Sequence, residues 1–479
     1  MAQPFVQPCD SGVIAAQPDP QALGREVAPQ RRRIVLAACV LASSMAFIDG
    51  SALTVALPRL RASFGADLAS VQWVINGYVL ALAALTLIGG ALADVYGKAR
   101  VLGIGCAGFG LASAACAFAP SIDWLIALRI VQGASAAIVT PASLALIGAT
   151  YPKPERAAAI GIWAAASALT TAGGPVLGGW LTESFSWRYV FAINPPLALA
   201  AIALLALHAP DDVREPRRFD LVGAAILALA LAPIAWALSE IGPNKMGAAN
   251  DIVVSGAGVL GLAAFAGYAL WERAAAQPMT PPRLIANRPF VGLNAATLLI
   301  YAGLAIMFFV LSFDLIDRRH LAPTQAGLVF LPFTLGVGLL SRPFGAVADK
   351  IGARAMLIAG PLVAAISFIW LALGRGAGLT AGVLAPLGLL GLAFAILVAP
   401  LTAAVLSSVA DADEGLASGI NNAMSRVAQL AGVALAAGLA SYASGFAASM
   451  IGAAVLAAGG AGVMAAMMPR RAGKRGRMR

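Results

Sequence analysis

The chain has 479 residues, 60% hydrophobic and 11% charged, and its mean hydropathy is +0.85. Soluble proteins carry roughly 45–50% apolar and about 25% charged residues, so this chain has too few charges to cover a soluble surface. A net charge of +10 would suit nucleic acid, but the Lys and Arg residues stand in short runs between apolar blocks, which argues against that partner. The composition predicts a polytopic membrane protein.

Fourteen apolar segments are long enough to cross a hydrocarbon core of about 30 Å. In chain order they are expected at residues 34–57, 72–92, 101–119, 125–147, 158–181, 189–207, 220–240, 252–271, 290–313, 325–345, 355–373, 379–406, 416–440 and 444–468. Residues 1–33 are polar and rich in proline, with no apolar core of a signal peptide, and are predicted to be a disordered cytoplasmic tail. Residues 469–479 form a basic tail.

The distribution of positive charge orients the spans. If the N-terminus is cytoplasmic, 22 of the 32 Lys and Arg residues fall in inside segments, 7 in outside segments and 3 within spans. Basic residues accumulate on the cytoplasmic side of membrane proteins. We therefore predict a multi-pass protein of the inner cell membrane with both termini in the cytoplasm.

Two short loops have similar sequences and indicate an internal repeat. The first is GALADVYGKAR at 90–100 and the second is GAVADKIGARA at 345–355. Each lies at a similar offset within a six-span unit, which is the pattern of transporters built from two parallel halves. We expect an all-α architecture with a first six-helix bundle at 34–207, two extra spans within a linker at 208–289, and a second bundle at 290–468.

The repeated loop resembles the signature of the major facilitator superfamily, and fourteen spans resemble its drug:H+ antiporter branch, whose members are proton-driven multidrug exporters. Four further motifs are similar to that branch: FIDGSALTVALP (47–58), LRIVQGASAA (128–137), AGGPVLGGW (172–180) and WRYVFAINPP (187–196). The chain departs from the family pattern at Val95, where Arg is frequent, and at FDLIDRR (313–319), which replaces a polar end containing Gln. Because of the second departure, the resemblance does not by itself assign a substrate of the family to this chain.

Asp49 lies within an apolar span, where a carboxylate is costly and is functional by default. Desolvation favours its protonated form, so it could take a proton from one side and release it when water or a cation arrives. The structural alternative is an aspartate that joins helices through Ser43, Ser51 or Thr54.

Arg129 follows one turn into the fourth span, with Gln132 on the same face. A buried guanidinium needs a carboxylate or several carbonyls, and near Asp49 it would tune proton affinity. A structural anchor between helices is the alternative. Arg426 lies beside further polar residues of a later span and is a weaker candidate for lining the transport cavity.

The fifth span combines a proline with small residues: Gly174, Pro175, Gly178 and Gly179. Proline bends a helix and glycine lets a partner helix approach closely, as a hinge between two transport states requires. Static packing in an Ala-rich chain is the alternative.

The paired loops are predicted to gate the cytoplasmic side, because a carboxylate after a span can cap the next helix and bind a basic group across the halves. The candidates are Gly90, Asp94, Gly97, Lys98 and Arg100 in the first loop and Gly345, Asp349, Gly352 and Arg354 in the second. Ordinary basic loops of the cytoplasmic face are the alternative.

Asp314, at the outer end of the ninth span, could attract a cation or relay protons, although a solvated loop explains it equally well. The sequence contains no clustered nucleophile, metal-ligand set or nucleotide-binding segment, so we expect no cofactor and no enzyme activity.

We therefore expect a monomeric secondary transporter that exports hydrophobic, cationic compounds in exchange for protons. Two alternatives stay open: a dedicated exporter of one metabolite, perhaps anionic, with Arg129 and Arg426 as counter-charges, and a sensory or assembly protein that no longer transports.

Overall fold

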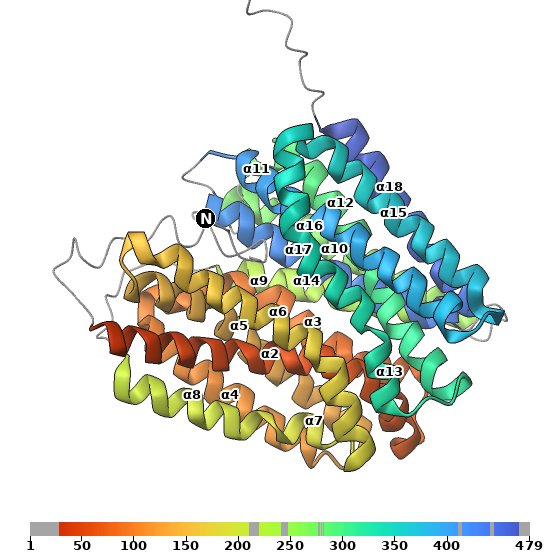
Figure 1. Ribbon diagram of the computed structural model, residues 1–479, viewed down its shortest axis with the longest axis horizontal. Coiled ribbons are helices and arrows are strands. Elements are labelled where there is room, and N and C mark those ends of the chain that lie inside the picture. The colour runs from red at the N-terminus through yellow and green to blue at the C-terminus, as the bar shows by residue number, and fades with distance from the viewer. Residues whose placement is uncertain are drawn as a thin grey trace, which may run out of the picture.

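The computed structural model describes residues 28–209, 220–240, 248–275, 278, 280, 282–410, 414–440 and 445–468, and its elements are helices (Figure 1). The first half contains α2 (Pro29–Phe64), α3 (Leu68–Tyr96), α4 (Lys98–Ala117), α5 (Ile122–Thr150), α6 (Lys153–Ser184), α7 (Tyr189–Ala192) and α8 (Asn194–His208). The linker contains α9 (Leu221–Ser239), α10 (Ala248–Ala274) and α11 (Pro282–Ile285).

The second half begins at α12 (Arg288–Phe313), which continues as the π-helix η2 (Asp314–Arg318). It then contains α13 (Pro323–Val329), α14 (Leu331–Ile351), α15 (Ala353–Leu373), η3 (Gly374–Gly376), η4 (Thr380–Leu384), α16 (Ala385–Ser407), α17 (Glu414–Ala440) and α18 (Gly445–Met467). The tails at 1–27 and 469–479 lie outside the described residues.

Among the described residues, thirteen helical segments are long and apolar enough to cross a membrane. The helix α9 is apolar as well, over Val222–Leu238, and is not counted among the thirteen. The prediction of an all-helical polytopic membrane protein is therefore confirmed, whereas the number fourteen is not.

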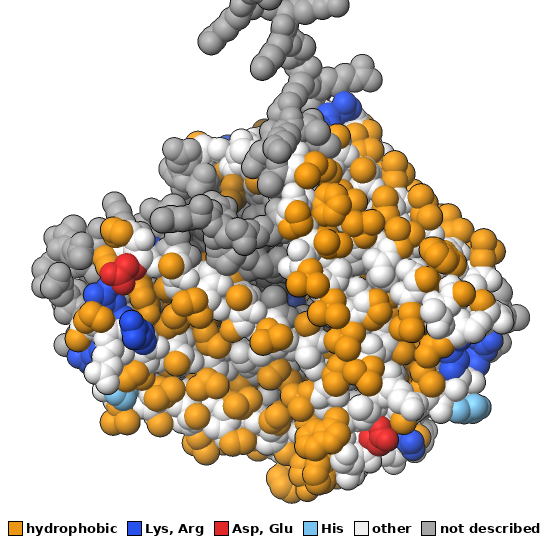
Figure 2. Space-filling view, viewed as in Figure 1, with side chains coloured by type: hydrophobic (Ala, Val, Ile, Leu, Met, Phe, Trp, Pro, Cys, Tyr) orange, Lys and Arg blue, Asp and Glu red, His pale blue; other side chains and the backbone are white. Residues whose placement is uncertain are grey.

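The surface of the protein is apolar, which fits a lipid environment. Leu111 is 73% exposed and Leu373 is 80% exposed. Figure 2 shows hydrophobic side chains over most of the visible face, with the visible charged side chains near its edges. In water such a surface would aggregate, whereas in a bilayer it contacts acyl chains.

The two halves form separate bundles (Figure 1). In the first, α5 packs against α3 and α4, while α2 packs against α6 and α8. In the second, α18 packs against α12 and α15, and α16 packs against α14 and α15. The longest seam between the bundles joins α3 to α17.

The two linker helices pack at this seam. α9 packs against α10 and also contacts both α3 and α17, so it bridges the two bundles. Ala224 of α9 is buried against Ile88 of α3. The extra helices therefore cover one side of the junction between the halves.

The two repeated loops share one backbone conformation. Gly97, between α3 and α4, has φ 100° and ψ 129°, and Gly352, between α14 and α15, has φ 101° and ψ 136°. Side chains with a Cβ rarely adopt this region, so each loop needs its glycine. The sequence repeat therefore corresponds to a structural repeat at these two turns.

We expect Gly97→Ala and Gly352→Ala each to destabilise the protein by about 1–3 kcal/mol, because the new Cβ is strained at this φ. Gly103→Ala is the control, since a Cβ at this helical position meets nothing within 4 Å. The measurement is the thermal-unfolding midpoint of the purified protein in one detergent. Equal midpoints for all three variants would contradict the argument.

Candidate functional site

A buried ion pair lies inside the first bundle. The Nη1 atom of Arg129 on α5 is 2.5 Å from Oδ2 of Asp49 on α2. The side chains are 1% and 0% exposed, respectively. A buried pair is tolerated only when further hydrogen bonds satisfy its remaining atoms, so the neighbours of both groups matter.

Amide side chains complete the hydrogen bonds of the carboxylate. Gln132 on α5 donates from Nε2 to Oδ1 of Asp49 at 3.0 Å, and its Oε1 accepts from Nη1 of Arg129 at 2.7 Å. Asn194, the first residue of α8, donates to the same Oδ1 at 3.4 Å and to the Ser113 hydroxyl at 2.9 Å. Asp49 is thus held by α5 and α8 together.

The guanidinium of Arg129 is enclosed by α3. Its Nε donates to the Val74 carbonyl at 2.9 Å, and its Cζ lies 4.1 Å from the centre of the Tyr78 ring. A cation over an aromatic face is stabilised by the ring quadrupole. The site therefore draws on α2, α3, α5 and α8.

The hydroxyl groups named as structural partners for Asp49 bind elsewhere. Ser43 accepts from the Trp163 indole at 2.9 Å and donates to Ser143 at 3.0 Å. Ser51 and Thr54 donate to carbonyls of their own helix. The described contacts of Asp49 are with basic and amide groups.

The glycine-rich part of α6 contacts both bundles. A Cβ on Gly174 or Gly178 would overlap with Ser51 or Ala52 of α2. A Cβ on Gly179 would overlap with the Pro323 carbonyl of α13, and one on Gly327 of α13 would overlap with the Pro175 carbonyl. Pro175 therefore lies where α6 touches the second half.

Other contacts between the halves lie near the same end of the bundles. Glu183 of α6 accepts a hydrogen bond from the backbone N–H of Thr324 at 3.1 Å. The Nη1 atom of Arg61 is 4.0 Å from Oδ2 of Asp317. We call this end, defined by Arg61, Glu183, Asp317 and Thr324, the closed end.

The predicted gating loops are described only in part. The side chains of Asp94 and Asp349 lie outside the described part of the structure. Lys98 is buried and Arg100 is exposed. A Cβ on Gly90 would meet Pro141 at 3.8 Å, and one on Gly345 would meet Ala399 at 3.5 Å, so both positions have ordinary packing space.

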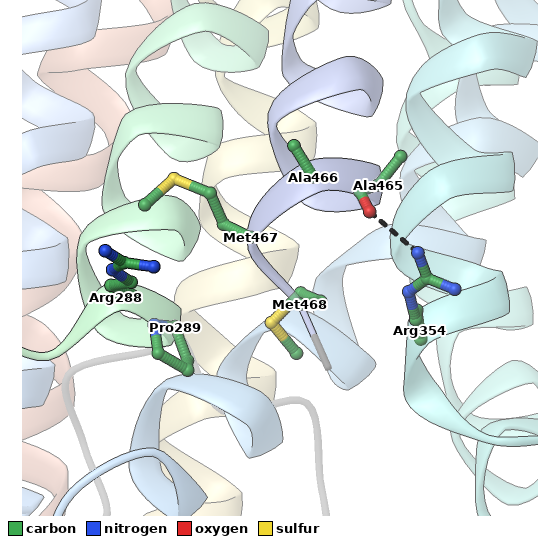
Figure 3. Close-up of a pocket in the computed structure, with 7 residues that line it drawn as sticks. All are labelled: Arg288, Pro289, Arg354, Ala465, Ala466, Met467 and Met468. Atoms are coloured by element: carbon green, nitrogen blue, oxygen red, sulfur yellow. Dashed lines mark hydrogen bonds between the residues drawn. The ribbon is translucent and has the colours of Figure 1, made fainter. Parts of the chain in front are cut away.

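Arg354 forms a bond within its own half. Its Nη2 donates to the Ala465 carbonyl of α18 at 2.7 Å, beside a cavity of about 660 Å³ (Figure 3). Arg288 and Met467 also line this cavity, which therefore lies among helices of the second bundle. This hydrogen bond joins two helices of the second bundle and does not reach the first bundle, as a gating contact between the halves would.

The described ion pairs of Asp314 do not include Asp49 or Arg129. Its Oδ1 atom is 3.1 Å from Nη1 of Arg318 and 3.4 Å from Nε of Arg375, and its Oδ2 atom is 3.0 Å from Nε of Arg319. Three guanidinium groups thus surround one carboxylate that is 2% exposed, and they join η2 to the turn after α15. The structure brings together Asp49, Arg129 and Gln132 but not Asp314.

Three contributors to the site were missed in the sequence: Tyr78, Ser113 and Asn194. Asn194 carried a usable signal, because it is a polar residue within the motif that begins the sixth span. Ser113 and Tyr78 carried none, since one hydroxyl or one aromatic ring in an apolar helix is common.

Two helical bundles with a shared loop conformation, one of them enclosing a buried ion pair, form the architecture of a membrane transporter built from two halves. The sequence pattern of the Major Facilitator Superfamily matches residues 39–274 and 293–478. The chain belongs to this superfamily.

Relatives of this chain have names that refer to drug resistance and export. The multidrug resistance protein Stp of Mycobacterium tuberculosis is 32% identical over 84% of this chain and 74% of its own length. The cephamycin export protein CmcT of Amycolatopsis lactamdurans is 35% identical over 80% and 81%. The tetracenomycin C resistance and export protein of Streptomyces glaucescens is 31% identical over 84% and 74%.

Solved structures with this fold are transporters. A peptide transporter POT in complex with sulfate has a TM-score of 0.69 at 17% identity, with 95% of this chain and 99% of that chain covered. The inward-open xylose transporter XylE from E. coli has a TM-score of 0.60 at 16% identity, with 92% and 97% covered. At this identity the likeness concerns the fold.

We expect Arg129→Gln to destabilise the protein by about 3–5 kcal/mol, because it leaves the Asp49 carboxylate buried without its counter-charge. The double variant Asp49→Asn/Arg129→Gln should recover most of this loss, since both groups are then neutral. Thermal unfolding in one detergent, arranged as a double-mutant cycle, measures the coupling.

The control is Arg61→Gln, whose partner Asp317 is half exposed and whose loss should cost at most about 1 kcal/mol. A double variant no more stable than Arg129→Gln would contradict the role of charge.

Proposed function

We propose that this protein exports lipophilic small molecules in exchange for protons, by alternating access across the cell membrane. The observation that carries the proposal is the buried Asp49–Arg129 pair inside an apolar bundle. The names of the relatives support drug or antibiotic export as the direction and class of transport. Both tails then face the cytoplasm, and one chain forms the whole unit.

Protonation of Asp49 changes the bonding of Arg129. An ionised Asp49 holds Nη1 of Arg129 and joins α2 to α5. A proton on the carboxyl removes this charge, and Arg129 then keeps the Val74 carbonyl, Gln132 Oε1 and the Tyr78 ring. The affinity for a proton is therefore linked to the spacing of α2 and α5, as coupling to a conformational change requires.

The closed end is the proposed outer gate. Gly179 and Gly327 let α6 and α13 approach with backbone against backbone, and Glu183 binds the start of α13. Such a contact is broken as a unit when one bundle rocks against the other. Of the glycines predicted as a hinge, Gly179 thus acts, in this proposal, at the surface where the halves separate, whereas Gly174 and Gly178 pack on α2 of the same half.

We propose a structural role for Asp314 in place of proton relay. Its two oxygens already accept from three arginines, which join η2 to the η3 turn. A carboxylate held this way fastens η2 to the η3 turn, and we assign it no part in proton transfer. Asp49 is the coupling residue in our proposal.

We expect Asp49→Asn to abolish proton-driven efflux, because the amide cannot bind and release a proton. The measurement is efflux of a xanthene dye from proteoliposomes with a pH gradient imposed and then collapsed. Asp123→Asn, at an exposed position in the first turn of α5, is the matched control and should keep gradient-dependent flux. Unchanged flux in Asp49→Asn would remove Asp49 from the coupling step.

We expect Gly179→Ala to open the closed end, because the methyl group occupies the space of the Pro323 carbonyl. A membrane-impermeant maleimide should then label Thr324→Cys faster, in a background without other cysteines. Gly173→Ala is the control, since a Cβ there meets nothing within 4 Å. Equal labelling rates for the two alanine variants would rule out the proposed gate.

A further inference from the structure

The seam between α3 and α17 contains buried polar groups that the pair at Asp49 does not use. Gln72 of α3 is fully buried, and its Nε2 donates to the carbonyls of Val433 and Ala434 in α17. Asn76 follows one turn later on the same side of α3, also fully buried. The hydrogen bonds of the Gln72 side chain thus join the two bundles at this seam.

Several atoms along this seam are buried without a hydrogen bond among the described residues. They are Oε1 of Gln72, both amide atoms of Asn76 and Nε of Arg426. Buried amides and guanidinium groups are nearly always bonded in native proteins, so a cluster of exceptions on two facing helices calls for a ligand. The groups offer donors and acceptors, with a single charge at Arg426.

Arg426 lies near the middle of α17, about 18 Å of helix from Glu414. No carboxylate among the described side chains pairs with it. Tyr78 interacts electrostatically with Asp49, Arg129 and Arg426, so the three charges act on one region. Because Asp49 and Arg129 neutralise each other, this region keeps one positive charge.

We propose that the exported substrate carries an acidic group, a carboxylate or an ionised phenol, which Arg426 binds. The inference rests on the proposed export function and names its substrate class. A guanidinium offers a planar fork that matches a carboxylate, and charge-assisted bonds of this kind are strong in a dry site. The amide of Asn76 then binds a neighbouring polar atom of the substrate.

This substrate class differs from the cations expected from the sequence. A cationic compound needs an unpaired carboxylate at mid-depth. Asp49 is already bonded to Arg129, while Glu183 and Asp314 are bonded near helix ends in the described structure. The net charge of the described centre therefore repels cations and attracts anions.

The test compares two xanthene dyes with the purified full chain, anionic fluorescein and cationic rhodamine 6G, by fluorescence anisotropy at neutral pH. The wild type should bind fluorescein more tightly. Arg426→Gln should weaken fluorescein binding by at least about tenfold, the loss of one charged hydrogen bond, and leave rhodamine binding unchanged or stronger. Arg273→Gln removes the same charge from an exposed position on α10 and should change neither.

Arg426→Lys is the second variant, for the case in which Arg426→Gln does not fold. It keeps the charge but loses the fork, so fluorescein affinity should fall by a smaller factor while rhodamine affinity stays constant. The inference is overturned if fluorescein does not bind, if rhodamine binds equally well, or if the Arg426 and Arg273 variants behave alike.

Flux assays separate this inference from the export proposal. Fluorescein binding that depends on Arg426, without gradient-driven flux of either dye, would support the anion site and overturn export. Gradient-driven flux of rhodamine alone would support export and overturn the anion site.

Discussion

The ion pair between Asp49 and Arg129 is removed from water on all sides, and this constraint determines much of the first bundle. A carboxylate and a guanidinium at this depth are stable only if nearly every remaining donor and acceptor is satisfied. That requirement brings Gln132 and Asn194 to Asp49, and the Val74 carbonyl and the Tyr78 ring to Arg129. Four helices thus have fixed positions because one charged pair must be enclosed.

The two bundles differ in how they hold charge. In the first bundle the negative charge of Asp49 and the positive charge of Arg129 cancel, so one added proton would leave a net positive charge. At the seam of the second bundle Arg426 has no matching carboxylate among the described residues, and the neighbouring amides are incompletely bonded. We infer that the first bundle handles the proton and that α17 handles the substrate. Tyr78 interacts electrostatically with the Asp49–Arg129 pair and with Arg426, so in this proposal it lies between the proton site and the substrate site.

Hydropathy predicted the helices to within a few residues because a span must be long and apolar whatever it packs against. The sequence also predicted Asp49 and Arg129, since charges within spans are rare and conspicuous. It could not predict the amide contacts of Asn194 or Gln72, because hydrogen-bond partners across helices depend on tertiary packing. The breaks at Ile193 and Phe330, each two residues before a proline, were not predicted.

The glycines of α6 connect the central site to the closed end. Gly174 and Gly178 seat α6 on α2, the helix that carries Asp49, while Gly179 seats the same helix on α13 of the other half. In the proposed cycle, a shift of α2 that follows protonation of Asp49 would act on α6 directly, because only the small Ser51 side chain and the backbone of α2 lie between the two helices. Backbone-to-backbone packing transmits displacement because close-packed interfaces have discrete arrangements and do not deform continuously. Proton binding at mid-depth and separation of the bundles at the closed end are, in this view, two ends of one rigid connection along α6.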